Sequence, residues 1–427
     1  LYNPSQAVTV LPNGRIEPGS GDLLNGLVWP EIATEAVGGW DLYKTRRNNF
    51  APRLGFAYSP WEKTVIRGGA GIYYGPGHVA RPNLARNPPF AQEVQLFGTN
   101  LSNPGAGSTR LLPVNLRSQD PSGLAATSYQ WSLNVQREIM PRTVFEFGYV
   151  GNRGLHLYYT RNLNKPEPDP DRKGSINAHR IFPGWANITF QEPSAASTYH
   201  AFETHLKRRF HEGFLAEVSY TFSKALGHGQ NQGNQPQDNR NLAAEWGRLN
   251  FDRTHILVAN FVYELPFWRL QDNLLKKVFG GWQIAGIANF QSGLIRNVSL
   301  SGDNAKVGGG PQRPDRVGDP NAGPETLEQW FNTGAFAQPA KGTFGNAGRN
   351  LVQMPGINSW DLALAKNTQI GWFGGEGARL QIRAELFNAF NHPQWEGVST
   401  NFNSHIFGQV TSAHDPRIVQ IGLKILY

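Results

Sequence analysis

Side chains able to do chemistry are present in this sequence, but their spacing matches none of the common catalytic motifs. The sequence has no Gly-x-Ser-x-Gly turn for a nucleophile, no Walker loop for phosphate and no His-Glu-x-x-His helix for zinc. The 11 histidines are scattered, and His200 and His205 stand five positions apart, so along a strand they face opposite sides. We expect no enzymatic activity, no metal site and no cofactor.

Three polar segments are similar to binding loops only in composition. The acidic run at 167–171 is stiffened by prolines and lacks the glycine turn of a calcium loop. The glycine-rich stretch at 301–310 precedes no clear helix, so we expect a flexible outer loop there and no phosphate cradle. The segment at 227–241 is rich in Gln, Asn and Gly, and it could bind sugars or peptides or simply be solvated.

A further group of charged side chains lies near the middle of segments in which apolar and polar residues alternate. Burying such charges without partners would be costly, so we expect cross-strand ion pairs. The same charges are candidates for contact with a plug domain or a passing substrate. They are Glu146, Glu203, Lys207, Glu217, Arg379, Arg383 and Glu385.

The alternation predicts that strands position these charges. In the stretch 214–224, Phe214, Val218 and Phe222 fall on one face, whereas Glu217 and Ser219 fall on the other. A period of two indicates a strand with one polar and one apolar side. Eleven such segments are expected, at 53–59, 64–74, 130–136, 145–149, 199–209, 214–224, 254–265, 282–291, 360–370, 378–390 and 416–427.

The links between these segments alternate in length. Short turns join strands within hairpins, and one link, 272–278, could hold one or two helical turns. Long polar links separate the hairpins, at 75–127, 153–197, 225–252, 293–356 and 391–415. Short turns on one rim and long loops on the other are typical of an outer-membrane barrel. A soluble β-sandwich or propeller fits less well, because the long links exceed those of regular blades and the polar faces carry charges.

Composition agrees with this all-β reading. The 427 residues include 48 Gly and 29 Pro, which suits many turns, and no run approaches the roughly 20 apolar residues that a spanning helix needs. The absence of cysteine excludes disulfides and thiolate metal sites. The net charge is +8, but the basic residues are scattered, so we expect anionic lipid headgroups or an acidic partner and no nucleic acid.

The last residues alternate up to an aromatic terminus. Val419, Ile421, Leu423, Ile425 and Tyr427 fall on one face of the final segment. A terminal aromatic on such a strand resembles the signal that the barrel-assembly machinery recognises, and it suits the headgroup boundary. Trp131, Tyr149, Tyr220 and Trp282 are further candidates for an interfacial aromatic girdle.

Several motifs in a fixed order resemble TonB-dependent receptors of the Oar-like branch. They are NFAPRLGFAY at 49–58, VIRGGAGIYY at 65–74, YQWSLNVQR at 129–137, Trp246 with FDRTH at 251–255, GWQIAG at 281–286, FGNAGR at 344–349 and RAELFNAFNH at 383–392. The resemblance runs from about residue 45 to the last residue. Each motif alone is weak, and their order and spacing make the set specific.

This resemblance implies a transmembrane antiparallel β-barrel of 22 strands with long extracellular loops, of which this chain supplies the C-terminal half. It also implies a plug and an N-terminal barrel half outside this chain, and energy from the TonB complex through a missing N-terminal box. We expect residues 1–49 to be an extracellular loop region and residues 50–427 to be the barrel wall. Because the sequence starts at Leu1 without a signal-peptide pattern, we expect a fragment or a processed chain.

Three functions remain open from the sequence. The first is ligand binding and energised passage of a bulky substrate in the outer membrane of a Gram-negative-type bacterium. The second is a structural or adhesive protein that holds a partner by the loops at 153–197 or 293–356. The third is a soluble all-β binding domain, in which the faces carrying Phe145, Phe147, Phe214 and Phe222 would be buried.

Overall fold

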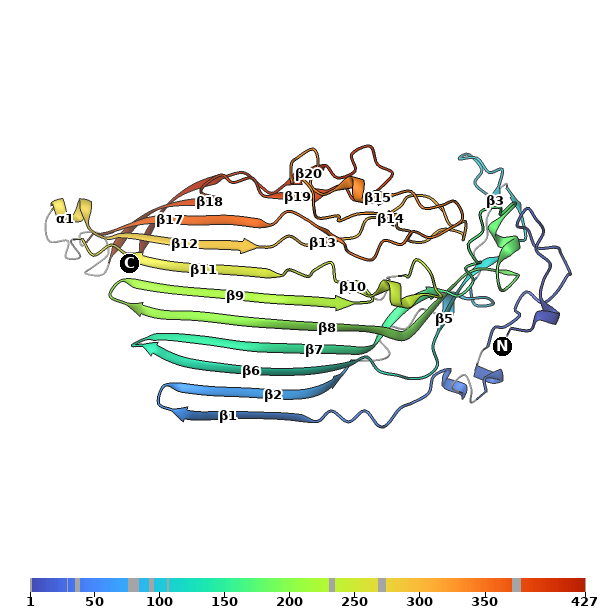
Figure 1. Ribbon diagram of the computed structural model, residues 1–427, viewed down its shortest axis with the longest axis horizontal. Coiled ribbons are helices and arrows are strands. Elements are labelled where there is room, and N and C mark those ends of the chain that lie inside the picture. The colour runs from blue at the N-terminus through green and yellow to red at the C-terminus, as the bar shows by residue number, and fades with distance from the viewer. Residues whose placement is uncertain are drawn as a thin grey trace.

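The computed structural model describes residues 2–28, 30–34, 39–75, 84–91, 96–105, 107–229, 235–267, 274–370 and 378–426. Within these residues, eleven strands follow one another in the order β1-β2-β6-β7-β8-β9-β11-β12-β17-β18-β21. Figure 1 shows them as a long wall. They are β1 (Arg53–Trp61), β2 (Thr64–Tyr74), β6 (Thr127–Met140), β7 (Thr143–Asn162), β8 (Trp185–His211), β9 (Phe214–Gly227), β11 (His255–Glu264), β12 (Trp282–Gln291), β17 (Ile357–Gln369), β18 (Arg379–Phe387) and β21 (Ile418–Leu426).

The wall confirms the all-β fold and the eleven expected strands. Neighbouring strands of this path pair antiparallel, as the hairpin pattern predicts. The turn between β8 and β9 shows why the chain reverses there: Glu212 and Gly213 both have positive φ, at 53° and 82°. Two such residues form the tight turn whose twist matches that of the flanking strands.

The strand register divides the wall into two faces. We call one the apolar face. It carries the even-numbered residues of 54–58, 64–74, 198–208, 214–226, 282–290, 358–368 and 380–386, and the odd-numbered residues of 127–137, 143–153, 255–263 and 419–425. The intervening residues form the polar face. Because directly paired residues share a face, the alternation in each strand continues from β1 to β21.

The two outermost strands have open edges. β1 and β21 stand at the ends of the strand order, and each pairs with one strand of the described chain. All but one of the nine residues of β1 are exposed. Unpaired backbone N–H and C=O groups cannot be satisfied by lipid, so a wall of this kind needs further strands at both edges.

Two strands are longer than the alternation predicts. β7 has 20 residues and β8 has 27, so the expected link at 153–197 is wrong in extent and shrinks to 163–184. Register shifts between Gly154, Leu157 and Tyr159 explain the error, because they interrupt the period of two. Beyond them, β5 (Val114–Gln119) pairs in parallel with β8.

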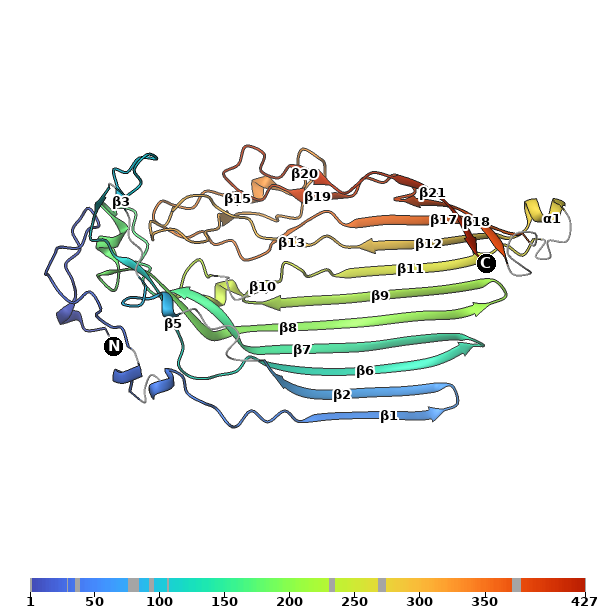
Figure 2. The same ribbon diagram turned by 180° about the vertical axis from the view of Figure 1, so that it is seen from behind.

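The long connections gather at one end of the wall and the short turns at the other (Figures 1 and 2). The helix α1 (Leu274–Phe279) lies at the short-turn end and confirms the expected helical turn in that link. The long connections contain β3 (Leu96–Phe97), β4 (Ser108–Thr109), β10 (Gly247–Arg248), β13 (Ile295–Arg296), β14 (Asp315–Arg316), β15 (Phe336–Ala337), β16 (Val352–Gln353), β19 (Trp395–Val398) and β20 (Val410–Ala413). Short 3-10 turns are η1 (Pro4–Gln6), η2 (Pro30–Ile32), η4 (Gly39–Asp41), η5 (Leu84–Arg86), η6 (Ile176–His179), η7 (Leu242–Glu245) and η8 (Thr333–Ala335).

Two small hydrophobic cores stiffen the long-loop end. One joins the connections 292–356 and 388–417, where Phe331 packs against Phe407 with ring centroids 5.1 Å apart. The other surrounds Trp185, whose indole N–H donates a hydrogen bond to the backbone oxygen of Asn25 at 3.0 Å. The N-terminal residues therefore pack against the far end of β8. No helix in the described ranges has the length and apolar character needed to span a membrane.

Candidate ligand-binding region

Four of the predicted charges lie together on the polar face of β7, β8 and β9. Lys207 stands directly opposite Glu217, and their side chains form the expected cross-strand ion pair, with 3.8 Å between Nζ and Oε1. The same Glu217 oxygen is 2.7 Å from Nε2 of His205. Glu146 is directly opposite His205. Glu203 lies one row from His205 on the same strand and is opposite Thr221. The four charges are three carboxylates and one ammonium group, so this patch is hydrophilic and predominantly acidic.

The other predicted charges lie on the polar face of β18, which three strands separate from β9 in the sheet order. Arg383 and Glu385 form an ion pair of 2.8 Å along one strand. Arg379 lies at the start of β18, opposite Gln369 and Leu426. The structure therefore brings the seven candidates onto one face, in two separate groups. As the sequence predicts, His200 lies on the apolar face and His205 on the polar face.

The residues of the expected insertion signal lie on the apolar face at the sheet edge. Val419, Ile421, Leu423 and Ile425 are all exposed there, between 57% and 77% of their surface. Tyr427 lies outside the described residues. An edge strand with exposed apolar side chains presents both unpaired backbone groups and an apolar surface to a partner.

A buried ion pair holds two of the long connections together. Glu245 at the end of η7 is 1% exposed and Arg313 is 2% exposed, and they form two parallel hydrogen bonds of 2.8 and 2.9 Å. Arg349 approaches the same carboxylate, with Nε 3.7 Å from Oε2. Burial lowers the pKa of Arg349. We call Glu245, Arg313 and Arg349, with Gln237 and Lys165, the loop clamp.

Gln237 and Lys165 complete the loop clamp. The Gln237 backbone N–H donates to Glu245 at 3.1 Å, and its side-chain oxygen accepts from the Arg313 backbone N–H at 2.9 Å. The Lys165 ammonium donates to the Gln237 backbone oxygen at 3.2 Å, and burial lowers the pKa of this lysine. The clamp thus ties the three connections 163–184, 228–254 and 292–356 into one unit.

Two aspartates fix local backbone beside the loop clamp. Asp252 is 1% exposed, receives the Arg248 guanidinium at 2.6 Å and accepts from the Ala225 backbone N–H at 2.8 Å. In the glycine-rich stretch, the Asp303 carboxylate accepts from Gly308 at 2.7 Å. Burial would raise the pKa of Asp303, but hydrogen bonds from Val307, Gly308 and other donors outweigh it and hold this pKa below its ordinary value. These hydrogen bonds hold the glycine-rich stretch in a turn around Asp303.

The sequence reasoning missed Glu245, Arg313 and Asp252 as structural centres. Asp252 lies in the motif FDRTH, and Arg349 lies in the motif FGNAGR. Acidic and basic residues inside these loop motifs are the sequence feature that could have indicated buried ion pairs. Nothing local pairs Glu245 with Arg313, because 68 positions separate them.

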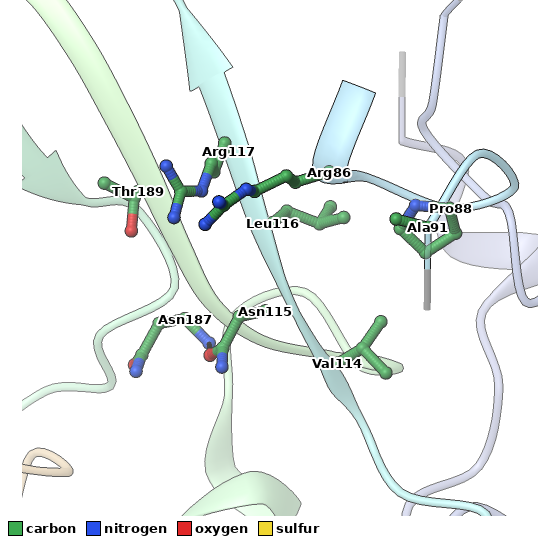
Figure 3. Close-up of a pocket in the computed structure, with 9 residues that line it drawn as sticks. All are labelled: Arg86, Pro88, Ala91, Val114, Asn115, Leu116, Arg117, Asn187 and Thr189. Carbon is green, nitrogen blue, oxygen red and sulfur yellow. Dashed lines mark hydrogen bonds between the residues drawn. The ribbon is translucent and has the colours of Figure 1, made fainter. Parts of the chain in front are cut away.

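A cavity of about 710 Å³ opens near the junction of β5 and β8. Its lining includes the guanidinium groups of Arg86 and Arg117 and the amides of Asn115 and Asn187, alongside apolar side chains. Figure 3 shows both arginines extending toward Thr189. The volume falls within the range of small-molecule sites. Across the described ranges, no three His, Cys, Asp or Glu side chains meet in a group that could hold a metal ion.

A family model described as outer membrane beta barrel domain matches residues 3–420. The chain belongs to this outer-membrane β-barrel family. This membership places the wall in the outer membrane of a Gram-negative bacterium, so the soluble alternative is wrong. The faces agree, because Phe147 and Phe222 of the barrel wall are 40% and 48% exposed.

Three solved structures are similar to this chain over most of its length. The barrel wall is similar to the outer membrane transporter YddB from Escherichia coli, at 10% identity and a TM-score of 0.43, over 85% of this chain and 38% of that one. The FrpB iron transporter (F5-1 variant) from Neisseria meningitidis matches at 12% identity and 0.43, over 88% and 39%. A mutant of the ferric enterobactin receptor PfeA from Pseudomonas aeruginosa matches at 12% and 0.43, over 88% and 40%.

This chain spans about two fifths of the length of these solved chains. No curated protein matches it in sequence.

Proposed function

We propose that this barrel wall belongs to a TonB-dependent receptor. In the complete protein, the long loops would face the outside and bind a bulky ligand. The ligand would then pass along the polar face when the TonB complex displaces a plug. The receptor motifs in the sequence support this proposal. The main structural support is the division of the wall into an apolar face and a polar face.

That division has a direct physical consequence for a closed barrel. No residue of the apolar face is Asp or Glu, whereas the polar face carries Glu146, Glu203, Glu217, Asp361 and Glu385. The apolar face must meet lipid, so the polar face lines the interior. Charged groups such as Glu217 with Lys207 keep that interior hydrated and able to contact a plug or a hydrophilic ligand. The arginine-lined cavity near β5 is a candidate first contact for a ligand with acidic groups.

The experiment uses the full-length protein in living cells and needs no knowledge of the ligand. A cysteine replaces Glu203 on the polar face, and its labelling by a water-soluble maleimide is followed with and without a protonophore. A receptor whose plug is displaced by TonB should label several-fold faster in energised cells. A matched cysteine at Glu328, in an exposed loop, should label at the same rate in both.

Equal labelling of the Glu203 position in both states would reject energised transport. It would favour the structural or adhesive alternative, in which the clamped loops hold a partner. In that case a partner should co-purify with the intact protein and be lost when 292–356 is cut by protease.

A further inference from the structure

The apolar face carries basic residues that have no acidic partner among the residues that the structure describes. Its charged positions are Arg137, Arg153, Arg208, Lys224 and Lys366. At the short-turn end, Arg208 covers the ring of Phe214, and Lys366 donates to backbone oxygens of Lys277 and Gly280. At the long-loop end, Arg153 and Lys224 are exposed, and within the described ranges neither has an ion pair. A cation on a lipid-facing surface is tolerated only near the boundary, where it meets a headgroup.

Two histidines lie between and beside these cations. His200 is directly opposite Lys224, and Arg153 is opposite the neighbouring Thr198. His255 is opposite Phe222, one row from Lys224. Paired and diagonal positions on one face lie within about 8 Å of each other, so these side chains form one patch across β7, β8, β9 and β11. We call Arg153, His200, Lys224 and His255 the basic patch; all four are exposed.

Each histidine of the basic patch is oriented by a tyrosine. The Tyr149 hydroxyl is 2.6 Å from Nδ1 of His200, and the Tyr220 hydroxyl is 2.9 Å from Nδ1 of His255. In both cases the rings also stack. When the tyrosine donates to Nδ1, the imidazole proton lies on Nε2, which has no protein partner in the described ranges and is free to donate to an oxygen anion.

The height of the basic patch places it at a membrane boundary. On β9, Phe214 starts the apolar face and Lys224 lies ten residues further. At about 3.3 Å per residue and a tilt of about 40°, ten residues rise about 25 Å, which is the height of the apolar band of a barrel. Phe202 and Phe222, which are 44% and 48% exposed, lie in the row of His255, one row nearer the short-turn end than His200 and Lys224. Above the patch the chain enters the long connections.

We propose that the basic patch binds the phosphate groups of the glycolipid that forms the outer leaflet of the outer membrane. Arg153 and Lys224 supply the charge, and the two imidazoles donate hydrogen bonds at a fixed spacing. The inference rests on the proposed orientation, in which the long loops face outward. It assigns a structural lipid to the outside of the wall, separate from any ligand that passes on the inside.

The test is native mass spectrometry of the full-length protein in detergent, titrated with bisphosphorylated lipid A. Wild-type protein should retain lipid A, and lipid A stripped of phosphate should bind at least tenfold more weakly. The double variant Arg153→Gln and Lys224→Gln should lose about 25-fold in affinity, since each cation near a headgroup contributes about fivefold. The matched control, Arg137→Gln and Arg209→Gln, removes the same charge at the short-turn end and should bind as wild type.

Equal binding of phosphorylated and stripped lipid by the wild-type protein would overturn the inference, and this arm remains decisive if the double variant does not fold. An equal loss in the control would also overturn it, because net charge would then explain the binding. Lipid retention does not depend on TonB or on plug movement. If the lipid binds as expected but the Glu203 position labels equally in both energy states, the proposal of transport is rejected and the lipid inference stands.

Discussion

Glu245 shows how much structure one buried charge fixes in this protein. Its carboxylate accepts from both terminal nitrogens of Arg313, 68 positions away, and from the backbone N–H of Gln237 in its own connection. Because both side chains of the ion pair are almost fully buried, neither can turn to water when the other is removed. The loop clamp therefore acts as one unit at the level of single residues.

We expect Glu245→Gln to loosen the loop clamp by about 3–5 kcal/mol, because Arg313 keeps its buried charge without a partner. Hydrogen exchange of 235–267 and 311–350 in the full-length protein measures this opening. Arg240→Gln is the control, because Arg240 is about half exposed in its ion pairs with Glu167 and Asp238, and such solvent-accessible pairs are worth at most about 1 kcal/mol. Exchange as slow in Glu245→Gln as in Arg240→Gln would contradict a central role for the clamp.

Asp303 should make its turn sensitive to acid. Its folded-state pKa is lowered, so its stabilisation is present above the ordinary carboxyl value and is lost as the pH falls below about 4. Hydrogen exchange at 303–312 is expressed relative to the intrinsic amide exchange rate at each pH, and on this scale it should accelerate in that acidic range in the wild type. Asp303→Asn should already exchange faster at neutral pH, with no further change on acidification. A wild-type profile as flat as that of the variant would refute the assignment.

Regular strands were predictable from the sequence, and interrupted ones were not. β2 and β12 have the bounds that alternation predicts, because nothing disturbs their period of two. β8 extends 14 residues further toward its N-terminus than expected, since the bulges near Leu157 shift the register and hide the alternation. The loop clamp escaped prediction for a different reason: Glu245 and Arg313 meet only through the tertiary fold. The predicted charges on the polar face were found because their strands are regular.

The edge strand β21 tests both the apolar face and the expected insertion signal. Ile421→Arg places a charge on the lipid-facing side, which costs about 2–4 kcal/mol near the bilayer midplane, so we expect a marked loss of assembled barrel. Gln420→Arg changes the neighbouring residue on the polar face and should assemble normally. Heat-modifiable gel mobility of the full-length protein in isolated outer membranes measures the assembled fraction. Equal assembly of both variants would mean that the two faces are wrongly assigned.

The open edges of β1 and β21 mean that a closed barrel requires further strands. We expect the native protein from isolated outer membranes to be longer than 427 residues, with further strands that pair with both edges. Intact mass and N-terminal sequencing measure this directly. A native chain that starts at Leu1 would instead require a second polypeptide to close the wall, and cross-linking at the edges would then have to capture it.

The length of β8 determines which part of the protein is reached first from outside the cell. Its 27 residues extend about 90 Å, and only the part near the turn lies against lipid. In the proposed orientation, the remaining residues, paired with β7 and β5, hold the clamped loops above the membrane. Antibodies, phages and toxins that approach from outside would meet these loops well before the wall. Variation that evades such attackers should therefore concentrate in 163–184 and 292–356, while the residues of the loop clamp stay fixed.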